Sequence, residues 1–118
     1  MRTILIENKF KNRAGVHLEG GWGNGYVLLN ESHPWHGLPY DDIPVHVHGG
    51  LTYSCIVSEG LIEWADNQLT KDDIGKYLIG FDTMHYGDDK FTWTKEAVQA
   101  EANRLLLQCN PNNIISDE

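Results

Sequence analysis

The sequence predicts an α+β fold: an antiparallel β-sheet with long irregular loops and one C-terminal helix packed on a face. Short apolar segments separated by glycine-, asparagine- and proline-rich stretches predict strands. An apolar stripe at helical spacing near the end of the chain predicts one long helix, and strands followed by a helix are typical of an α+β domain. The 118 residues suffice for one core. We expect a single domain over residues 1–111 and a tail over residues 112–118.

The strands are predicted from period-two alternation and from their β-branched and aromatic content. Asn24-Gly25 is expected to form a left-handed turn before one strand, and Glu59-Gly60 to form the turn of a hairpin. The expected strands span residues 2–10, 16–18, 26–29, 51–58, 61–64 and 77–81. One face of the 51–58 strand is expected to pack beneath the helix, and it consists of Leu51, Tyr53, Cys55 and Val57.

The long helix has clear end signals. Thr94 is its expected N-cap, Glu96 places a carboxylate in the first turn, and Asn110-Pro111 ends it. A single helical turn is also expected after Thr70, with Asp73 three residues on as in a capping box. The apolar stripe of the long helix comprises Val98, Ala102, Leu105, Leu106 and Cys109.

The composition limits the partners and the compartment. The chain has 17 Asp and Glu residues against 9 Lys and Arg residues, a formal net charge of -8, so neither duplex nucleic acid nor a membrane is an expected partner. The basic cluster of Lys9, Lys11 and Arg13 is too small to reverse this. The sequence shows no signal peptide and no run of transmembrane length, and Cys55 and Cys109 are expected to be buried free thiols. A cytosolic protein fits best.

The segment Val45-His46-Val47-His48-Gly49-Gly50 is the strongest candidate for part of a site. Period-two alternation places the two histidines on one side of an extended chain and the two valines on the other. The glycine pair lets the backbone bend sharply or lets a ligand approach closely. An aromatic loop stiffened by prolines, residues 33–44, precedes the segment, and such long loops are usually functional.

A metal-dependent hydrolase is one interpretation of the histidines. His46 and His48 can reach one ion, and Asp82, His85 and Asp88 offer further nitrogen and oxygen ligands. No spacing matches a known zinc motif, and histidines in polar loops more often serve as hydrogen-bond partners.

Acid–base catalysis without a metal is a second interpretation. His33, His36 and His85 are candidate bases, and Asp41-Asp42 and Asp88-Asp89 are adjacent carboxylates. Neighbouring aspartates in loops are usually turn formers, and the chain has no nucleophile elbow or Ser-His-Asp order.

Binding of a small polar ligand is the third interpretation. Aromatic faces stack on bases, while histidines, aspartates and backbone N–H groups orient polar edges, although many aromatic residues of a small domain build its core. The glycine run at residues 20–25 lacks the spacing of a P-loop or dinucleotide fingerprint. The aromatic residues concerned are Trp22, Trp35, Tyr40, Tyr53, Trp64, Phe81, Tyr86 and Trp93.

Four motifs resemble those of a family of small proteins encoded by bacteriophages and prophages. Gly25-Tyr26-Val27 matches a GYV strand, residues 33–42 match HPxxGxxYDD, residues 47–54 match VHGGLTYS, and residues 80–88 match GFDxxHxGD. The resemblance covers most of the chain from Gly25 to Cys109. Thr83-Met84 stands where the family often has Cys-Ala, which argues against a required thiol. The resemblance implies a phage-type accessory protein of the bacterial host cytoplasm, where such proteins often counter host defence, some by sequestering nucleotide-derived immune signals.

We therefore expect a non-enzymatic protein that binds and sequesters a small nucleotide-derived signal. It is expected to need no cofactor and to form a homodimer or higher homo-oligomer. Because the chain is acidic, phosphates would need Arg13, Lys9, Lys76 or backbone N–H groups as local positive partners. The alternatives are a metal-dependent hydrolase acting on a nucleotide-like substrate and an acidic inhibitor of a host protein.

The expected ligand site combines the aromatic loop with the histidine and glycine segments. Trp35 and Tyr40 are the expected stacking walls, with Asp42 and Asp82 as acceptors and the Gly49-Gly50 backbone against the ligand. His48 and His85 are the expected orienting donors. The full expected set is His33, Trp35, Tyr40, Asp41, Asp42, His48, Gly49, Gly50, Thr52, Phe81, Asp82, His85 and Asp88, and the alternative metal set is His46, His48, His85 and Asp82.

Overall fold

The computed structural model describes residues 1–8 and 20–110 and confirms the α+β fold. Its four-stranded sheet has the order β1-β2-β4-β3, with every neighbouring pair antiparallel. The expected strand at 16–18, the basic residues between 9 and 13, Pro111 and the tail lie outside the described residues. The elements are β1 (Arg2–Glu7), β2 (Gly23–Leu29), η1 (Tyr40–Asp42), β3 (Tyr53–Ile56), α1 (Glu59–Trp64), η2 (Lys71–Asp73), β4 (Tyr77–Phe81) and α2 (Lys95–Cys109).

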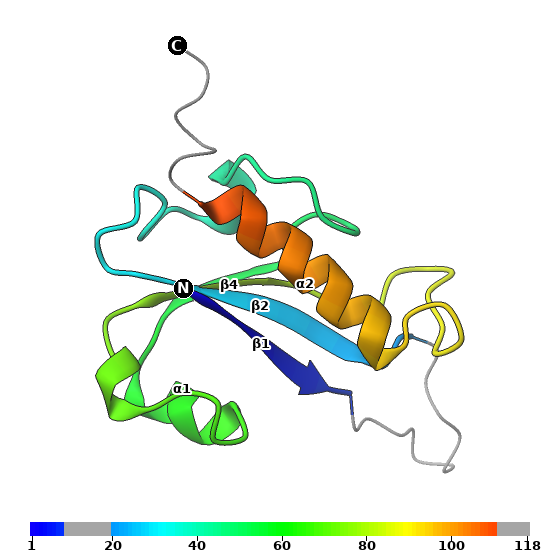
Figure 1. Cartoon of the computed structure of the whole chain (residues 1–118), viewed down its shortest axis with the longest axis horizontal. Helices are drawn as coiled ribbons and strands as arrows, with labels where there is room; N and C mark the ends of the chain where they lie inside the picture. Colours follow the sequence, from blue (N-terminus) through cyan, green and yellow to red (C-terminus); the bar gives the residue numbers. More distant parts are fainter. Residues whose placement is uncertain (9–19, 111–118) are drawn as a thin grey trace.

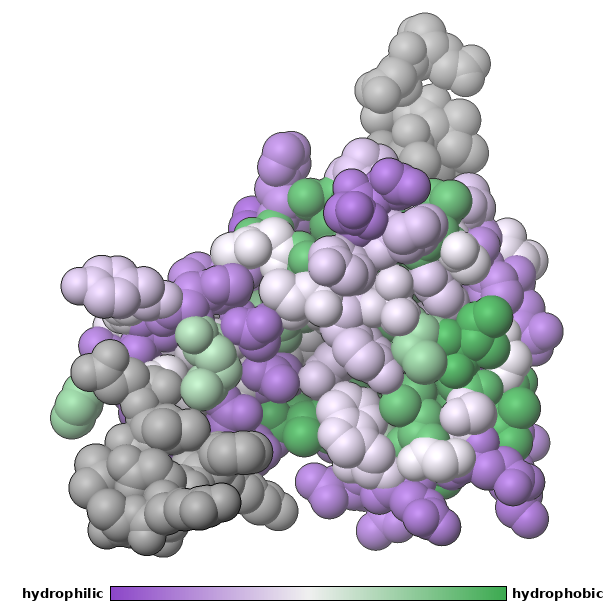
Figure 2. Space-filling model, turned by 180° about the vertical axis from the view of Figure 1, so that it is seen from behind, coloured by the Kyte–Doolittle hydropathy of each residue, from purple (hydrophilic) through white to green (hydrophobic). Residues whose placement is uncertain are grey.

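The sheet lies between two hydrophobic clusters, one on each face. α2 covers one face, and α1 lies on the other side of the sheet (Figure 1). The α2-side cluster includes Val27, Ile79 and Phe81, while the α1-side cluster includes Tyr26 and Leu78. Seen from behind, hydrophobic residues gather at the end of the molecule that carries α1 (Figure 2). No helix among the described residues is both long and apolar enough to cross a membrane.

The central strands β2 and β4 fit together because a glycine faces an aromatic ring on each side of the sheet. Gly25 stands opposite Phe81, and a side chain at Gly25 would come within 2.6 Å of the Phe81 ring. Tyr26 stands opposite Gly80, where a side chain would overlap the Tyr26 ring. The two large rings therefore occupy the space that a side chain would take at each glycine, on opposite faces of the sheet, which lets both clusters pack closely.

α2 forms as its end signals predict. The Thr94 hydroxyl accepts a hydrogen bond from the Ala97 N–H at 3.2 Å, and the helix ends at Cys109. Its stripe is buried against the sheet, with Leu106 partly exposed beside it. Burial raises the pKa of the Cys109 thiol to about 12. Cys109 is thus a buried thiol as expected, whereas Cys55 is only partly buried.

Residues 61–64, expected as the return strand of a hairpin, belong to the helix α1 instead. Ser58 is the N-cap residue with an extended backbone, and the N–H of Leu61 donates to its carbonyl at 3.1 Å. Leu61, Ile62 and Ala65 all pack on the α1-side cluster. A strand would turn adjacent Leu61 and Ile62 to opposite faces, whereas a helix buries both together with the residue one turn on.

The sheet also corrects two further expectations. Asn24-Gly25 lies inside β2 rather than in a turn, and neither residue has a positive φ. The face that includes Tyr53 and Val57 packs on the α1 side, not beneath α2. The register explains this, because Tyr53 stands opposite Gly80, on the face that carries the Tyr26 ring. Leu51, which precedes β3, is the member of that set that packs on the α2-side cluster.

Asp73 ties the start of β1 to η2 and is almost fully buried, at 2% exposure. Its carboxylate accepts from Arg2 at 2.7 Å, from Lys76 at 3.1 Å and from the Thr70 N–H at 2.9 Å, which confirms the expected capping box. The hydrogen bond from Arg2 is the largest cause that holds the pKa of Asp73 well below its ordinary value, against the opposing effect of burial. Lys76, one of the alternative positive partners named for a phosphate, is thus engaged by this carboxylate.

The Asp73 network predicts a pH-dependent contribution to stability. An Asp in the unfolded chain has a pKa of about 3.9, and a lowered folded-state pKa stabilises the fold above that pH and ceases to do so as the pH falls. Asp73→Asn should lower the free energy of unfolding by about 2 kcal/mol at pH 7, with a smaller difference from wild type at pH 3. Urea denaturation at both pH values measures this. The neighbouring exposed carboxylate provides the control, since Asp72→Asn should change the free energy by less than about 0.5 kcal/mol.

Candidate functional site

The 45–50 segment lies along α2 and is held there by side chains of the helix rather than by a strand. Gln108 clamps the backbone of His46, accepting from its N–H at 2.7 Å and donating to its carbonyl at 2.9 Å. The N–H of His48 donates to Glu101 at 2.7 Å. Val45 and Val47 pack on the α2-side cluster, so the expected alternation of valines and histidines holds without a β-ladder.

Glu101 is the polar anchor beneath this segment. Its side chain is only 11% exposed, and its carboxylate accepts from Arg104 at 2.8 and 3.1 Å as well as from the His48 N–H. Hydrogen bonds, chiefly from Arg104 and then from the His48 backbone, lower the pKa of Glu101 against the opposing effect of burial. Glu101 is therefore an anionic group held by the protein's own donors at neutral pH.

The imidazole of His48 is fixed by a buried carboxylate. Its Nε2 lies 2.8 and 2.9 Å from the two oxygens of Asp88, which is 7% exposed. The N–H of His85 also donates to Asp88, at 3.0 Å. The His48 ring packs on Trp93 with centroids 4.3 Å apart and an interplanar angle of 35°. Because a carboxylate only accepts, Nε2 carries the proton, and Nδ1 of the neutral ring presents a lone pair.

A second histidine–aspartate pair adjoins the first. His85 Nε2 lies 3.3 Å from Asp82 Oδ1, and the His85 ring meets that of His48 edge to face with centroids 5.4 Å apart. The same ring packs against Gly49, where a Cβ would overlap Nε2. Gly49 has a φ of +70°, a backbone conformation that a side chain disfavours. The glycine predicted for close approach is thus required by a ring of the protein itself.

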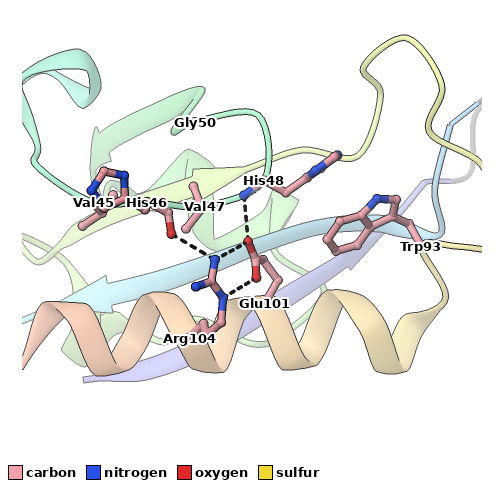
Figure 3. Close-up of a pocket in the computed structure, with 8 residues that line it drawn as sticks. All are labelled: Val45, His46, Val47, His48, Gly50, Trp93, Glu101 and Arg104. Atoms are coloured by element: carbon pink, nitrogen blue, oxygen red, sulfur yellow. Dashed lines mark hydrogen bonds and ion pairs between the residues drawn. The ribbon is translucent and has the colours of Figure 1, made fainter.

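An open pocket of about 600 Å³ lies between the 45–50 segment and α2 (Figure 3). Trp93 stands at one end and Val45 at the other, while Glu101 and Arg104 point from the helix toward the segment. The apolar side chains can contact a flat ligand, and Arg104, whose side chain is 58% exposed, can still reach an anion. The full lining consists of Val45, His46, Val47, His48, Gly50, Trp93, Glu101 and Arg104.

The structure brings part of the predicted site together. His48 and Gly50 line the pocket, and Asp88 contacts His48 directly. Gly49, Asp82 and His85 form the adjoining layer. Thr52 is paired through its N–H with the Gly80 carbonyl of β4.

Other predicted residues lie in the core. Trp35, expected as a stacking wall, is 6% exposed, and Phe81 is 1% exposed. His33 Nδ1 accepts from the Trp35 N–H at 3.0 Å, so its Nε2 donates to the Cys109 carbonyl at 2.6 Å. These three side chains therefore support the fold. They are too deeply buried to offer much surface to a ligand.

The η1 turn, which carries the predicted Tyr40, Asp41 and Asp42, is exposed and does not line this pocket. A ligand role for these three residues stays a prediction. Among residues 1–8 and 20–110, no group of three or more His, Cys, Asp or Glu side chains is placed to hold a metal ion. The alternative metal set, His46, His48, His85 and Asp82, is thus not assembled as a ligand sphere within the described part of the chain.

Three residues of the pocket were not singled out from the sequence. Trp93 was only one of eight aromatic candidates, while Glu101 and Arg104 look like an ordinary charged pair on a helix surface. For Glu101 and Arg104, the one signal in the sequence is their position. Both lie within one turn of the apolar stripe of α2, and thus at the edge of the face that packs on the sheet.

Comparison of the chain with protein-family models, with curated proteins and with solved structures found no match.

The two glycines of the segment give a matched test of its packing. Both have positive φ, but a Cβ at Gly50 would meet nothing within 4 Å, whereas one at Gly49 would overlap His85. Gly50→Ala should cost only backbone strain, about 1 kcal/mol. Gly49→Ala should cost about 3 kcal/mol and shift the NMR resonances of the His85 ring. Urea denaturation of both variants measures the difference, and equal losses would contradict the described contact.

Proposed function

We propose that the protein binds a small nucleotide-derived ligand in the pocket between the 45–50 segment and α2, and sequesters it unchanged. One observation supports this best: the open pocket holds an aromatic ring, Trp93, beside an imidazole whose orientation is fixed by buried Asp88. A small ligand site needs an apolar surface for contact area and a few oriented polar groups for specificity. The pocket has both.

The nucleoside part of such a ligand fits the end of the pocket near Trp93. Any base can stack on an aromatic side chain, because every base has a flat aromatic face. This contact therefore does not depend on which base the ligand carries. His48 Nδ1 is an acceptor in the neutral ring, suited to an amino or hydroxyl donor of a base or ribose. The carboxylate of Glu101 is already engaged by Arg104 and the His48 N–H, so it chiefly positions these two groups.

The charged part of the ligand belongs at the rim. Arg104 is the pocket's guanidinium, and its Nη2 also donates to the His46 carbonyl at 3.2 Å. Because Glu101 partly neutralises it, Arg104 supports one phosphate at the solvent edge rather than a buried polyphosphate. The overall charge of -8 favours the same arrangement, with the anionic groups kept in solvent.

The resemblance to phage proteins gives this binding a biological setting. In a bacterial host, a small protein that holds a nucleotide-derived immune signal would counter defence by lowering the free concentration of that signal. This setting rests on the four sequence motifs, and the pocket supports only the binding step.

Acid–base catalysis is a second candidate function, favoured by the contact between His48 and Asp88. A partly exposed imidazole held by a buried carboxylate is the arrangement in which a histidine accepts and returns a proton. With Nε2 bound to Asp88, Nδ1 would be the atom that exchanges the proton with a ligand hydroxyl or a water molecule.

Ligand capture distinguishes the two functions. The protein is incubated with a panel of nucleotides and cyclic nucleotide signals, freed of unbound compound, denatured by heat and its supernatant analysed by chromatography. Sequestration predicts recovery of one intact compound only after denaturation. Recovery of a changed product would establish catalysis, and His48→Gln should then abolish the change. Capture of none of these compounds would contradict the proposed ligand class.

Trp93 provides the test of the pocket itself. Trp93→Ala should weaken binding of the captured compound about 5- to 150-fold by calorimetry, because stacking on one base contributes about 1–3 kcal/mol. Trp64→Ala is the matched control: Trp64 is 41% exposed but contacts Tyr26 and Tyr53, on the other side of the sheet. Equal losses in both variants, or no loss with Trp93→Ala, would place the ligand elsewhere.

A further inference from the structure

β1 is an edge strand of the described sheet, and a side chain binds both backbone groups of one of its residues, Leu5. Within residues 1–8 and 20–110, β1 pairs with a strand on one side only, and that strand is β2. On its other side, the Leu5 N–H donates to Gln68 Oε1 at 3.1 Å, and Gln68 Nε2 donates to the Leu5 carbonyl at 2.7 Å. The amide of Gln68 thus supplies one acceptor and one donor to one residue, as a neighbouring antiparallel strand would.

The backbone before Gln68 is held in an unfavourable conformation. Asp66 and Asn67 have φ values of 51° and 65°, and two successive non-glycine residues in the left-handed region are uncommon. Arg2 then donates to the Gln68 carbonyl at 2.7 Å, which holds this residue against β1. Backbone strain of this kind is often found where it positions a functional group, and the group positioned here is the side chain of Gln68.

We propose that the β1 edge is a self-association surface that Gln68 keeps closed, and that its occupant once Gln68 is withdrawn is β1 of a second copy of this chain. Exposed edge strands pair with other strands unless something covers them. The centre of β1 is Ile4-Leu5-Ile6, an apolar stretch with strong β propensity and no charge. The surface is independent of the ligand pocket, since the two share no lining residue.

The register of this pairing follows from which peptide groups face outward. Leu5 faces the edge, so by alternation Thr3 and Glu7 do as well, and these three residues line a groove of about 370 Å³ along the edge. A two-fold axis at Leu5 places Leu5 opposite Leu5 and Thr3 opposite Glu7. Ile4 then stands opposite Ile6, which gives apolar cross-strand pairs at the centre and polar pairs outside.

The first test removes the amide. Gln68→Ala should lower the dimer dissociation constant at least tenfold relative to wild type in sedimentation velocity over a range of protein concentrations. Gln68→Glu, which replaces the donor to the Leu5 carbonyl with an acceptor, should act in the same direction. Gln99→Ala is the matched control, because Gln99 lines the same groove but donates at 3.1 Å to the Thr3 hydroxyl and not to the β1 backbone. It should leave the dissociation constant unchanged.

The second test checks the register through the charge opposite Glu7. In the Gln68→Ala background, Thr3→Glu should place two carboxylates opposite each other and raise the dissociation constant about tenfold. Thr3→Lys at the same position should lower it instead. Folded Gln68→Ala and Gln68→Glu proteins that associate no more than wild type would overturn the proposal. Equal effects of Thr3→Glu and Thr3→Lys would overturn the β1–β1 register.

Discussion

The reciprocal packing of glycine and aromatic ring across β2 and β4 is the constraint on which the rest of the structure depends. Gly25 accepts the Phe81 ring on the α2 side, and Gly80 accepts the Tyr26 ring on the α1 side. The register is thereby fixed, because a slip by one residue would place either the two rings or the two glycines opposite each other, depending on its direction. It also fixes where β4 ends, and thus where the loop that carries His85 and Asp88 begins.

The sequence predicted those elements whose local signals agree with their packing. β4 coincides with its predicted range, and α2 begins after Thr94 as its cap indicates. The prediction of a strand at residues 61–64 was wrong, because a short segment with three apolar residues is compatible with a strand or a helix, and only its packing on the sheet decides between them. The prediction that Tyr53 faces α2 was wrong for a related reason. Alternation shows that a strand has two different faces, but the pairing of Tyr53 with Gly80 determines which face meets α2.

The candidate site was predictable where the backbone itself signals it. Gly49-Gly50 and the flanking His48 mark a bend with a polar side chain, and the structure brings His85 and Asp88 to that bend. Glu101 and Arg104 were not predictable, because their role depends on which loop lies over α2. Trp35 shows the opposite error. A tryptophan beside prolines and histidines resembles a binding residue in sequence, yet this one fills the core beneath the end of α2.

The attachment of the 45–50 segment has a consequence for how the pocket exchanges its contents. The backbone groups of His46 and His48 are bound by side chains of α2, so the segment can lift away without breaking a hydrogen bond of the β-ladder. Such an opening is local and costs less free energy than unfolding of the sheet. The residence time of a ligand can therefore be set by the local contacts that hold the segment, namely Glu101 and Gln108 of α2, Asp88, and the packing of Val45 and Val47, while β2 and β4 set the lifetime of the fold.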